Sequence, residues 1–113
     1  MTQPLPLDPY IVDVLMRDLV GHDRAPSAFV VYLWAWRSGP GAGRARIGAS
    51  LQTIATRTGL SKSAVQAAVR HLTRRGLLTA TRARPTDAPV YEIHAPWRRE
   101  AVTGESGTAK PAQ

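Results

Sequence analysis

Apolar residues at helical spacing mark two segments in the first third of the chain. In residues 10–20 the apolar stripe consists of Ile11, Val14, Leu15 and Leu19, with Val12 beside it. Charged residues occupy the other side, so the segment predicts an amphipathic helix of about three turns, which Gly21 would end. Residues 5–9 alternate proline with apolar residues and predict an extended arm before this helix.

The second segment begins at Pro26, whose missing amide proton is harmless in the first turn of a helix. We expect this helix to run to about Ser38. Its apolar side chains cover much of its circumference: Phe29, Val30, Leu33, Trp34 and Trp36. The helix is therefore expected at the centre of the domain, with its aromatic cluster in the core and any leftover aromatic surface open to a partner subunit. Residues 39–43 would follow as a flexible connector, and residues 44–49 as a short edge strand around Ile47.

Residues 51–78 predict a helix, a tight turn, a second helix and the start of a strand. Ser50 and Ser61 precede the two helices, and each hydroxyl can accept a hydrogen bond from the free amides of the first turn. Ala55 is small where the second helix must cross closely, and Gly59 can take the positive φ that turns the chain. Leu60 would fill the corner between the helices.

The second of these helices has two distinct faces. Its inward stripe consists of Val65, Ala68, Val69 and Leu72, and its outward face carries Lys62, Ser63, Gln66, Ala67 and Arg70. The outward side chains are short or polar near the amino-terminal end, and cationic further along. This distribution suits a helix that enters the major groove end first, with base edges near Lys62, Ser63 and Gln66 and phosphates near Arg70. For Ser63 and Gln66 a plain solvent-facing role is the alternative.

The run from Ser50 to Leu78 resembles the winged helix-turn-helix of bacterial regulators. GntR-type amino-terminal domains and the DNA-binding domains of plasmid and phage replication proteins share its pattern, and the resemblance covers roughly residues 26–97. The residues that carry the match are Ala55, Gly59, Leu60, Ser61, Val65, Arg74, Arg75, Gly76, Leu77 and Leu78.

The resemblance implies a wing after the second helix. Gly76 would end the recognition helix, and residues 77–82 and 90–94 would form strands joined by a turn at residues 85–89. Arg82 and Arg84 would stand near the wing tip, where such residues contact phosphate or an adjacent minor groove. Asp87 in the same loop departs from this pattern and weakens the cationic tip.

Charge favours an anionic macromolecule as partner. The formal net charge is +7 and the sequence pI is about 11.1. Residues 24–86 contain no Asp or Glu, while their cations are Arg24, Arg37, Arg44, Arg46, Arg57, Lys62, Arg70, Arg74, Arg75, Arg82 and Arg84. Clustered cations without carboxylates nearby in sequence favour phosphate, because neutralising phosphates releases counterions. Arg74 and Arg75 have a second interpretation, as cations that complement the helix macrodipole. Arg44, Arg46 and Arg57 could contact the DNA backbone or remain solvated.

Other classes of chemistry find little support. Cysteine is absent, and His22, His71 and His94 lack the i, i+4 spacing of paired metal ligands. No Gly-rich phosphate loop with lysine and no Gly-x-Ser-x-Gly elbow occurs, and only Asp87 and Glu92 supply carboxylates between Arg24 and Arg99. We therefore expect no metal, no cofactor and no enzymatic activity. The apolar runs are too short to span a bilayer and the amino terminus lacks a signal-type core, so we expect a cytoplasmic, nucleoid-associated protein.

The predicted fold is α+β, mainly α: a winged helix-turn-helix with an extra amino-terminal helix and a small antiparallel β-wing. Residues 1–25 would form an arm and helix, residues 26–97 the winged helix-turn-helix domain, and residues 98–113 a disordered basic or polar tail.

The predicted function is sequence-selective binding of double-stranded DNA by a small transcriptional regulator. The predicted DNA-binding residues are Ser61, Lys62, Ser63, Gln66, Arg70, Arg74, Arg82 and Arg84. A homodimer through residues 10–20 and the exposed part of residues 28–36 would supply two copies for neighbouring half-sites. No small-molecule ligand is expected, because no second domain is present to sense one. The alternatives are a plasmid or phage replication or partition protein, and a protein-interaction module whose cationic surface meets an acidic partner.

Overall fold

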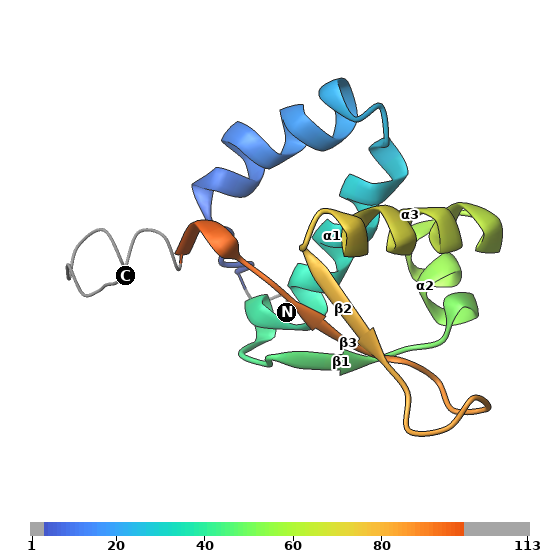
Figure 1. Cartoon of the computed structure of the whole chain (residues 1–113). Coiled ribbons are helices and arrows are strands. Elements are labelled where there is room, and N and C mark those ends of the chain that lie inside the picture. The colour runs from blue at the N-terminus through green and yellow to red at the C-terminus, as the bar shows by residue number, and fades with distance from the viewer. Residues whose placement is uncertain (1–3, 99–113) are drawn as a thin grey trace.

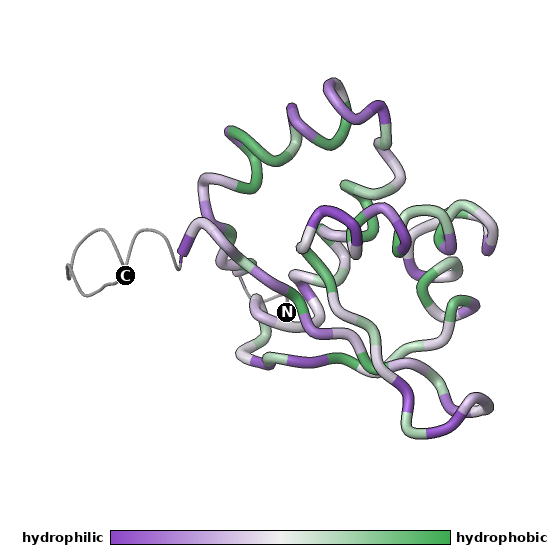
Figure 2. Tube along the Cα trace, in the orientation of Figure 1, coloured by the Kyte–Doolittle hydropathy of each residue, from purple (hydrophilic) through white to green (hydrophobic). Residues whose placement is uncertain are grey.

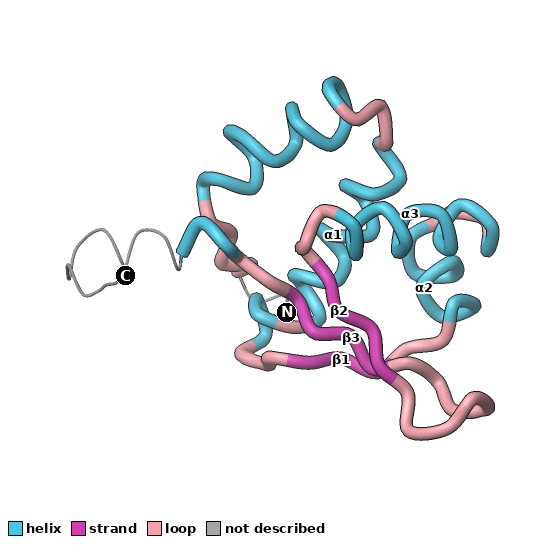
Figure 3. Tube along the Cα trace, viewed as in Figure 1, coloured by secondary structure: helices cyan, strands magenta, loops and turns pink. Residues whose placement is uncertain are grey.

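The computed structural model describes residues 4–98 and consists of helices packed over a small antiparallel sheet (Figures 1 and 3). The elements in chain order are η1 (Ile11–Leu15), η2 (Arg17–His22), α1 (Pro26–Ser38), η3 (Pro40–Ala42), β1 (Arg46–Gly48), α2 (Leu51–Thr58), α3 (Lys62–Arg74), β2 (Leu78–Thr81) and β3 (Val90–Ile93). This arrangement confirms the predicted mainly helical α+β fold and its winged-helix architecture.

The three strands form one sheet in the order β1-β3-β2, so the central strand is the last in sequence. Both pairings are antiparallel, and Tyr91 of β3 stands opposite Ile47 on one side and Ala80 on the other. Ile47, Leu78 and Tyr91 are buried because they face the helical layer. The short strand predicted around Ile47 is therefore confirmed as an edge strand.

α1 lies at the centre of the molecule, as its apolar circumference predicted. Tyr32 and Trp36 are almost completely buried, and they also satisfy their polar atoms. The Tyr32 hydroxyl donates to the backbone carbonyl of His94 at 2.8 Å, and Trp36 Nε1 donates to the carbonyl of Pro6 at 2.8 Å. Burial raises the pKa of Tyr32 above its ordinary value. Phe29, Tyr32 and Trp36 are thus core, whereas Leu33 and Trp34 are partly buried and Val30 remains exposed.

The extended arm and the end of the described chain meet beside this core. The Tyr10 and Trp97 rings stack with centroids 4.7 Å apart. Asp8 accepts hydrogen bonds from Trp97 Nε1 at 2.8 Å and from Arg98 Nε at 2.6 Å, and the Arg98 hydrogen bond is the main reason that the pKa of Asp8 is lowered. These contacts hold the arm against the end of the described chain.

The predicted amino-terminal amphipathic helix is present, but Gly21 does not end it. It is π-helical: the amide of Met16 bonds to the carbonyl of Ile11, and that of Asp23 to the carbonyl of Asp18, each five residues back. The wider helix keeps its buried residues, spaced four apart, on one line: Ile11, Leu15 and Leu19. η2 continues through Gly21 to His22, and the chain turns only at Arg24, whose φ is +54°.

Two further expectations concern the segments outside the main elements. The connector after α1 is not irregular, because residues 40–42 form a 3-10 turn in which the Ala42 amide bonds to the Gly39 carbonyl at 2.9 Å. The predicted disordered tail lies outside the described residues, apart from Arg98. Among residues 4–98, no helix combines the length and the apolar character that crossing a membrane requires.

Candidate nucleic-acid interface

Local sequence signals set the geometry of α2 and α3. Ser50 and Ser61 cap the two helices, and their Oγ atoms accept from the amides of Thr53 and Ala64, each at 3.1 Å. Gly59 between the helices has a φ of +82°, in the left-handed region that favours glycine. All three predicted signals are confirmed, so the turn between α2 and α3 is encoded within a few residues.

The two predicted faces of α3 are also confirmed. Val65, Ala68 and Leu72 are buried against the core, and Val69 packs against it partly buried. The predicted DNA-binding residues are all exposed: Ser61, Lys62, Ser63, Gln66, Arg70, Arg74, Arg82 and Arg84. Lys62, Gln66 and Arg70 follow one another at intervals of four residues and therefore lie along one side of the helix. No acidic side chain lies on α3, so this side is purely cationic and polar.

Four of these residues also have partners within the molecule: Ser61, Ser63, Arg74 and Arg82. The Ser61 hydroxyl serves as the helix cap and lies 3.3 Å from the hydroxyl of Ser63. Arg74 Nη2 lies 3.5 Å from Nδ1 of His71, one turn away on the same helix. Lys62, Gln66 and Arg70 make no side-chain hydrogen bond or ion pair within residues 4–98. Their polar groups are therefore free to meet an external partner.

The β2–β3 loop extends away from the body of the molecule beyond α2, and most of it is hydrophilic (Figures 1 and 2). Arg82 Nη1 donates to the backbone carbonyl of Pro85 at 3.0 Å, and the Asp87 amide bonds to the carbonyl of Arg84 at 3.0 Å. Arg82 is thus partly engaged in shaping the loop, whereas the Arg84 side chain has no hydrogen-bond partner among the described residues. Asp87 forms no ion pair with these arginines.

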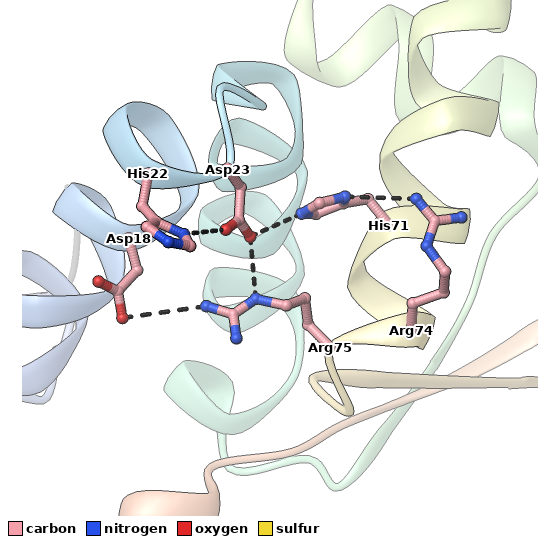
Figure 4. Close-up of polar contacts among 6 residues, drawn as sticks. All are labelled: Asp18, His22, Asp23, His71, Arg74 and Arg75. Atoms are coloured by element: carbon pink, nitrogen blue, oxygen red, sulfur yellow. Dashed lines mark hydrogen bonds and ion pairs between the residues drawn. The ribbon is translucent and has the colours of Figure 1, made fainter.

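A polar cluster around Asp23, which the sequence did not predict, joins the amino-terminal segment to the end of α3 (Figure 4). The Asp23 carboxylate accepts hydrogen bonds from His22 Nδ1 at 2.9 Å, His71 Nε2 at 2.8 Å and Arg75 Nε at 2.9 Å. Arg75 Nη2 also lies 3.9 Å from Asp18. Asp23 is the last acidic residue before the acid-free stretch. Its carboxylate pairs with Arg75, which has no acidic neighbour in the sequence.

The Asp23 cluster has two consequences for the interface. Arg75 is turned toward the amino-terminal segment, so of the two arginines at the end of α3 only Arg74 remains available to DNA. The hydrogen bonds from His22 and His71, together with the nearby charge of Arg75, lower the pKa of Asp23 to about 2. The carboxylate is therefore charged throughout the physiological range and fixes the carboxyl-terminal end of α3. Within the described residues, no group of His, Asp or Glu side chains could hold a metal ion.

Comparison with known proteins finds a match over the part of the chain that contains the turn, α3 and most of the β2–β3 loop. Residues 41–88 match the model of the MarR family. The MarR match spans β1, α2, α3, β2 and most of the loop, and it leaves η1, η2, α1 and β3 outside. It supports a bacterial winged-helix DNA-binding domain of the kind that serves transcription regulation, and it supports neither the GntR-type nor the replication-protein subtype. No curated protein and no solved structure matches the chain.

Proposed function

We propose that the protein is a sequence-selective regulator of transcription that binds double-stranded DNA through α3. The observation that carries this proposal is the exposed row of Lys62, Gln66 and Arg70 on a helix without acidic residues. An α-helix fits the major groove of B-form DNA, where amide and cationic side chains can read base edges and phosphates. The MarR match to residues 41–88 supports the same general role.

The proposed DNA-binding side chains would have different roles. Lys62, Ser63 and Gln66 stand at the amino-terminal half of α3 and would reach base edges, while Arg70 and Arg74 would bind phosphate. Ser61 contributes mainly by capping the helix, because its hydroxyl already accepts from the Ala64 amide. Arg84 in the β2–β3 loop would contact the backbone or the adjacent minor groove, with Arg82 bracing the loop.

The protein would act as a homodimer, because a single module contacts too little DNA for useful specificity. η1 and η2 carry a row of exposed apolar side chains at intervals of four residues, and these are Val12, Met16 and Val20. This row lies beside the buried one, roughly a quarter turn around the helix, and overlaps the interface predicted from the sequence. Binding to chromosomal DNA would place the dimer in the bacterial cytoplasm.

Equilibrium binding to duplex DNA tests the proposal. Duplexes that wild-type protein enriches from a random pool provide the probe, and repeated half-sites among them would report symmetry. Lys62→Ala/Arg70→Ala should weaken binding by roughly 30- to 1,000-fold, because the variant can bind neither the base edge nor the phosphate that these two side chains would reach. Arg17→Ala, an exposed arginine on η2, is the control for loss of charge and should bind as wild type. Retained affinity of the folded double variant would remove the α3 assignment.

The two alternatives predict different results in the same experiments. A replication or partition protein would select iterated repeats instead of paired half-sites. A protein-interaction module would enrich no duplex sequence, and its weak DNA binding would not depend on Gln66.

A further inference from the structure

A cavity of about 570 Å³ lies between the carboxyl-terminal half of α1, the β1 strand and α2. The residues that define its chemistry are Trp34, Arg37, Arg44, Arg46, Ile47 and Arg57. None of its lining residues belongs to α3 or to the β2–β3 loop. Its volume falls within the range of about 300 to 1,000 Å³ that is typical of small-molecule sites.

The four arginines of this cavity have no partners of their own. Among residues 4–98, the arginines in ion pairs are Arg75 and Arg98, and none of the four makes a side-chain hydrogen bond. No Asp or Glu lines the cavity. Glu92 stands opposite Arg46 in the β1–β3 pairing, on the outer face of the sheet, without forming an ion pair. Arg46 therefore also borders a hollow on this outer face, whereas Arg37, Arg44 and Arg57 line the cavity without a carboxylate nearby. A polyanion bound there would be stabilised.

One wall of the cavity is aromatic and has an unused donor. Trp34 is only partly buried, whereas Trp36 on the same helix is in the core. The indole N–H groups of Trp36 and Trp97 donate to Pro6 and Asp8, but that of Trp34 has no partner among the described residues. A partly buried indole in the wall of a cavity that arginine side chains also line offers a planar ring a surface for stacking.

We propose that this cavity binds a nucleotide that carries two or more phosphate groups. The guanidinium group is planar and matches phosphate with paired hydrogen bonds. Arg37, Arg44 and Arg57 would hold the phosphates, and Trp34 with Ile47 would hold the base. The sequence predicted no small-molecule ligand, but this cavity forms between α1, β1 and α2.

Calorimetric titration of the full-length protein tests this site. ATP is the probe, in metal-free buffer so that no cation neutralises its phosphates, and adenosine and inorganic tripolyphosphate are the comparison ligands. ATP should saturate one site per chain, while each comparison ligand should bind at least about ten-fold more weakly, since each has only one of the two recognition elements. Bound ATP should also raise the Tm.

Variants locate the binding in the cavity. Arg37→Ala/Arg57→Ala should reduce ATP affinity at least about ten-fold and leave duplex affinity unchanged, because neither residue lies on α3 or the loop. Trp34→Leu should reduce ATP affinity and not tripolyphosphate affinity; the arginine variant remains informative if Trp34→Leu fails to fold. Arg17→Ala is the matched control.

Three results would overturn the site. These are the absence of saturable ATP binding by folded wild-type protein, equal affinity for ATP and tripolyphosphate, and ATP binding that survives Arg37→Ala/Arg57→Ala. If the double variant loses duplex affinity and ATP does not bind, the cavity belongs to the DNA interface instead. Loss of the α3 assignment with ATP binding retained would refute the regulator proposal alone.

Discussion

The carboxylate of Asp23 joins residues that lie far apart in sequence, since it accepts hydrogen bonds from His22, His71 and Arg75. Such contacts between distant residues could not be predicted from spacing. One signal was present: His71 and Arg75 lie four residues apart and so share one side of the helix end. That pattern predicts a common partner but does not identify it.

We expect Asp23→Asn to destabilise the fold by about 1.5 to 3 kcal/mol, the usual contribution of hydrogen bonds to a charged group. The Asp23 pKa of about 2 lies below the ordinary value of 3.8. The carboxylate therefore stabilises the folded state fully above about pH 4, and this contribution is lost as the pH falls toward 2.

Urea denaturation between pH 2 and 7 measures this effect. The difference between wild type and Asp23→Asn should shrink as the pH falls through this window. Asp13→Asn, an exposed acid without a hydrogen bond among the described side chains, should leave the free energy of unfolding unchanged. A difference that is constant from pH 2 to 7 would show that the charge of Asp23 contributes nothing.

At the scale of elements, the sequence predicted α1, α2, α3 and the wing, because local signals fix them. Serine caps, a left-handed glycine and alternating faces act within a few residues. The predicted amino-terminal amphipathic helix is present, but its π-helical hydrogen bonding was not predicted, because bonding over five residues leaves no signature in the apolar pattern. The spacing of Ile11, Leu15 and Leu19 suits both helix types and does not distinguish them.

Gly59, in the turn between α2 and α3, can be compared with Gly21 as a control. An added Cβ would meet no atom within 4 Å at either Gly59 or Gly21, but only Gly59 has a positive φ. Gly59→Ala should therefore destabilise the protein by about 1 to 2 kcal/mol through backbone strain alone. Gly21→Ala, in the helical η2, should be neutral or slightly stabilising. Thermal unfolding of both variants measures the difference in stability, and equal Tm values would contradict the strain argument.

At the scale of the whole molecule, the exposed row on η1 and η2 remains without a partner in the single chain. Val12, Met16 and Val20 have relative exposures of 45%, 38% and 39%. If a second copy covers this row, wild-type protein should sediment as a dimer at tens of micromolar, and Met16→Glu should sediment as a monomer. Asp87→Asn, which changes an exposed acid in the β2–β3 loop outside this segment, is the control and should sediment as wild type. A wild-type monomer with and without DNA would refute the dimer.

The proposed DNA-binding face of α3 could be predicted from the sequence, whereas the cavity could not. The exposed side of α3 followed from the apolar period, and every residue predicted to bind DNA is at the surface. The cavity between α1, β1 and α2 could not be foreseen, because Arg37, Arg44 and Arg57 come together only when three elements pack. Sequence reasoning therefore identified the exposed helix face and missed the cavity formed between elements.

The most direct test of the central claim is the salt dependence of duplex affinity for the wild type and for Lys62→Ala/Arg70→Ala. If α3 binds DNA as proposed, the logarithm of the binding constant falls linearly with the logarithm of salt concentration, with a slope of about −0.9 for each phosphate that the protein neutralises. The double variant should show a shallower slope, by about one for each phosphate that it no longer binds. A wild-type affinity that does not change with salt, or identical slopes for the two proteins, would contradict the claim.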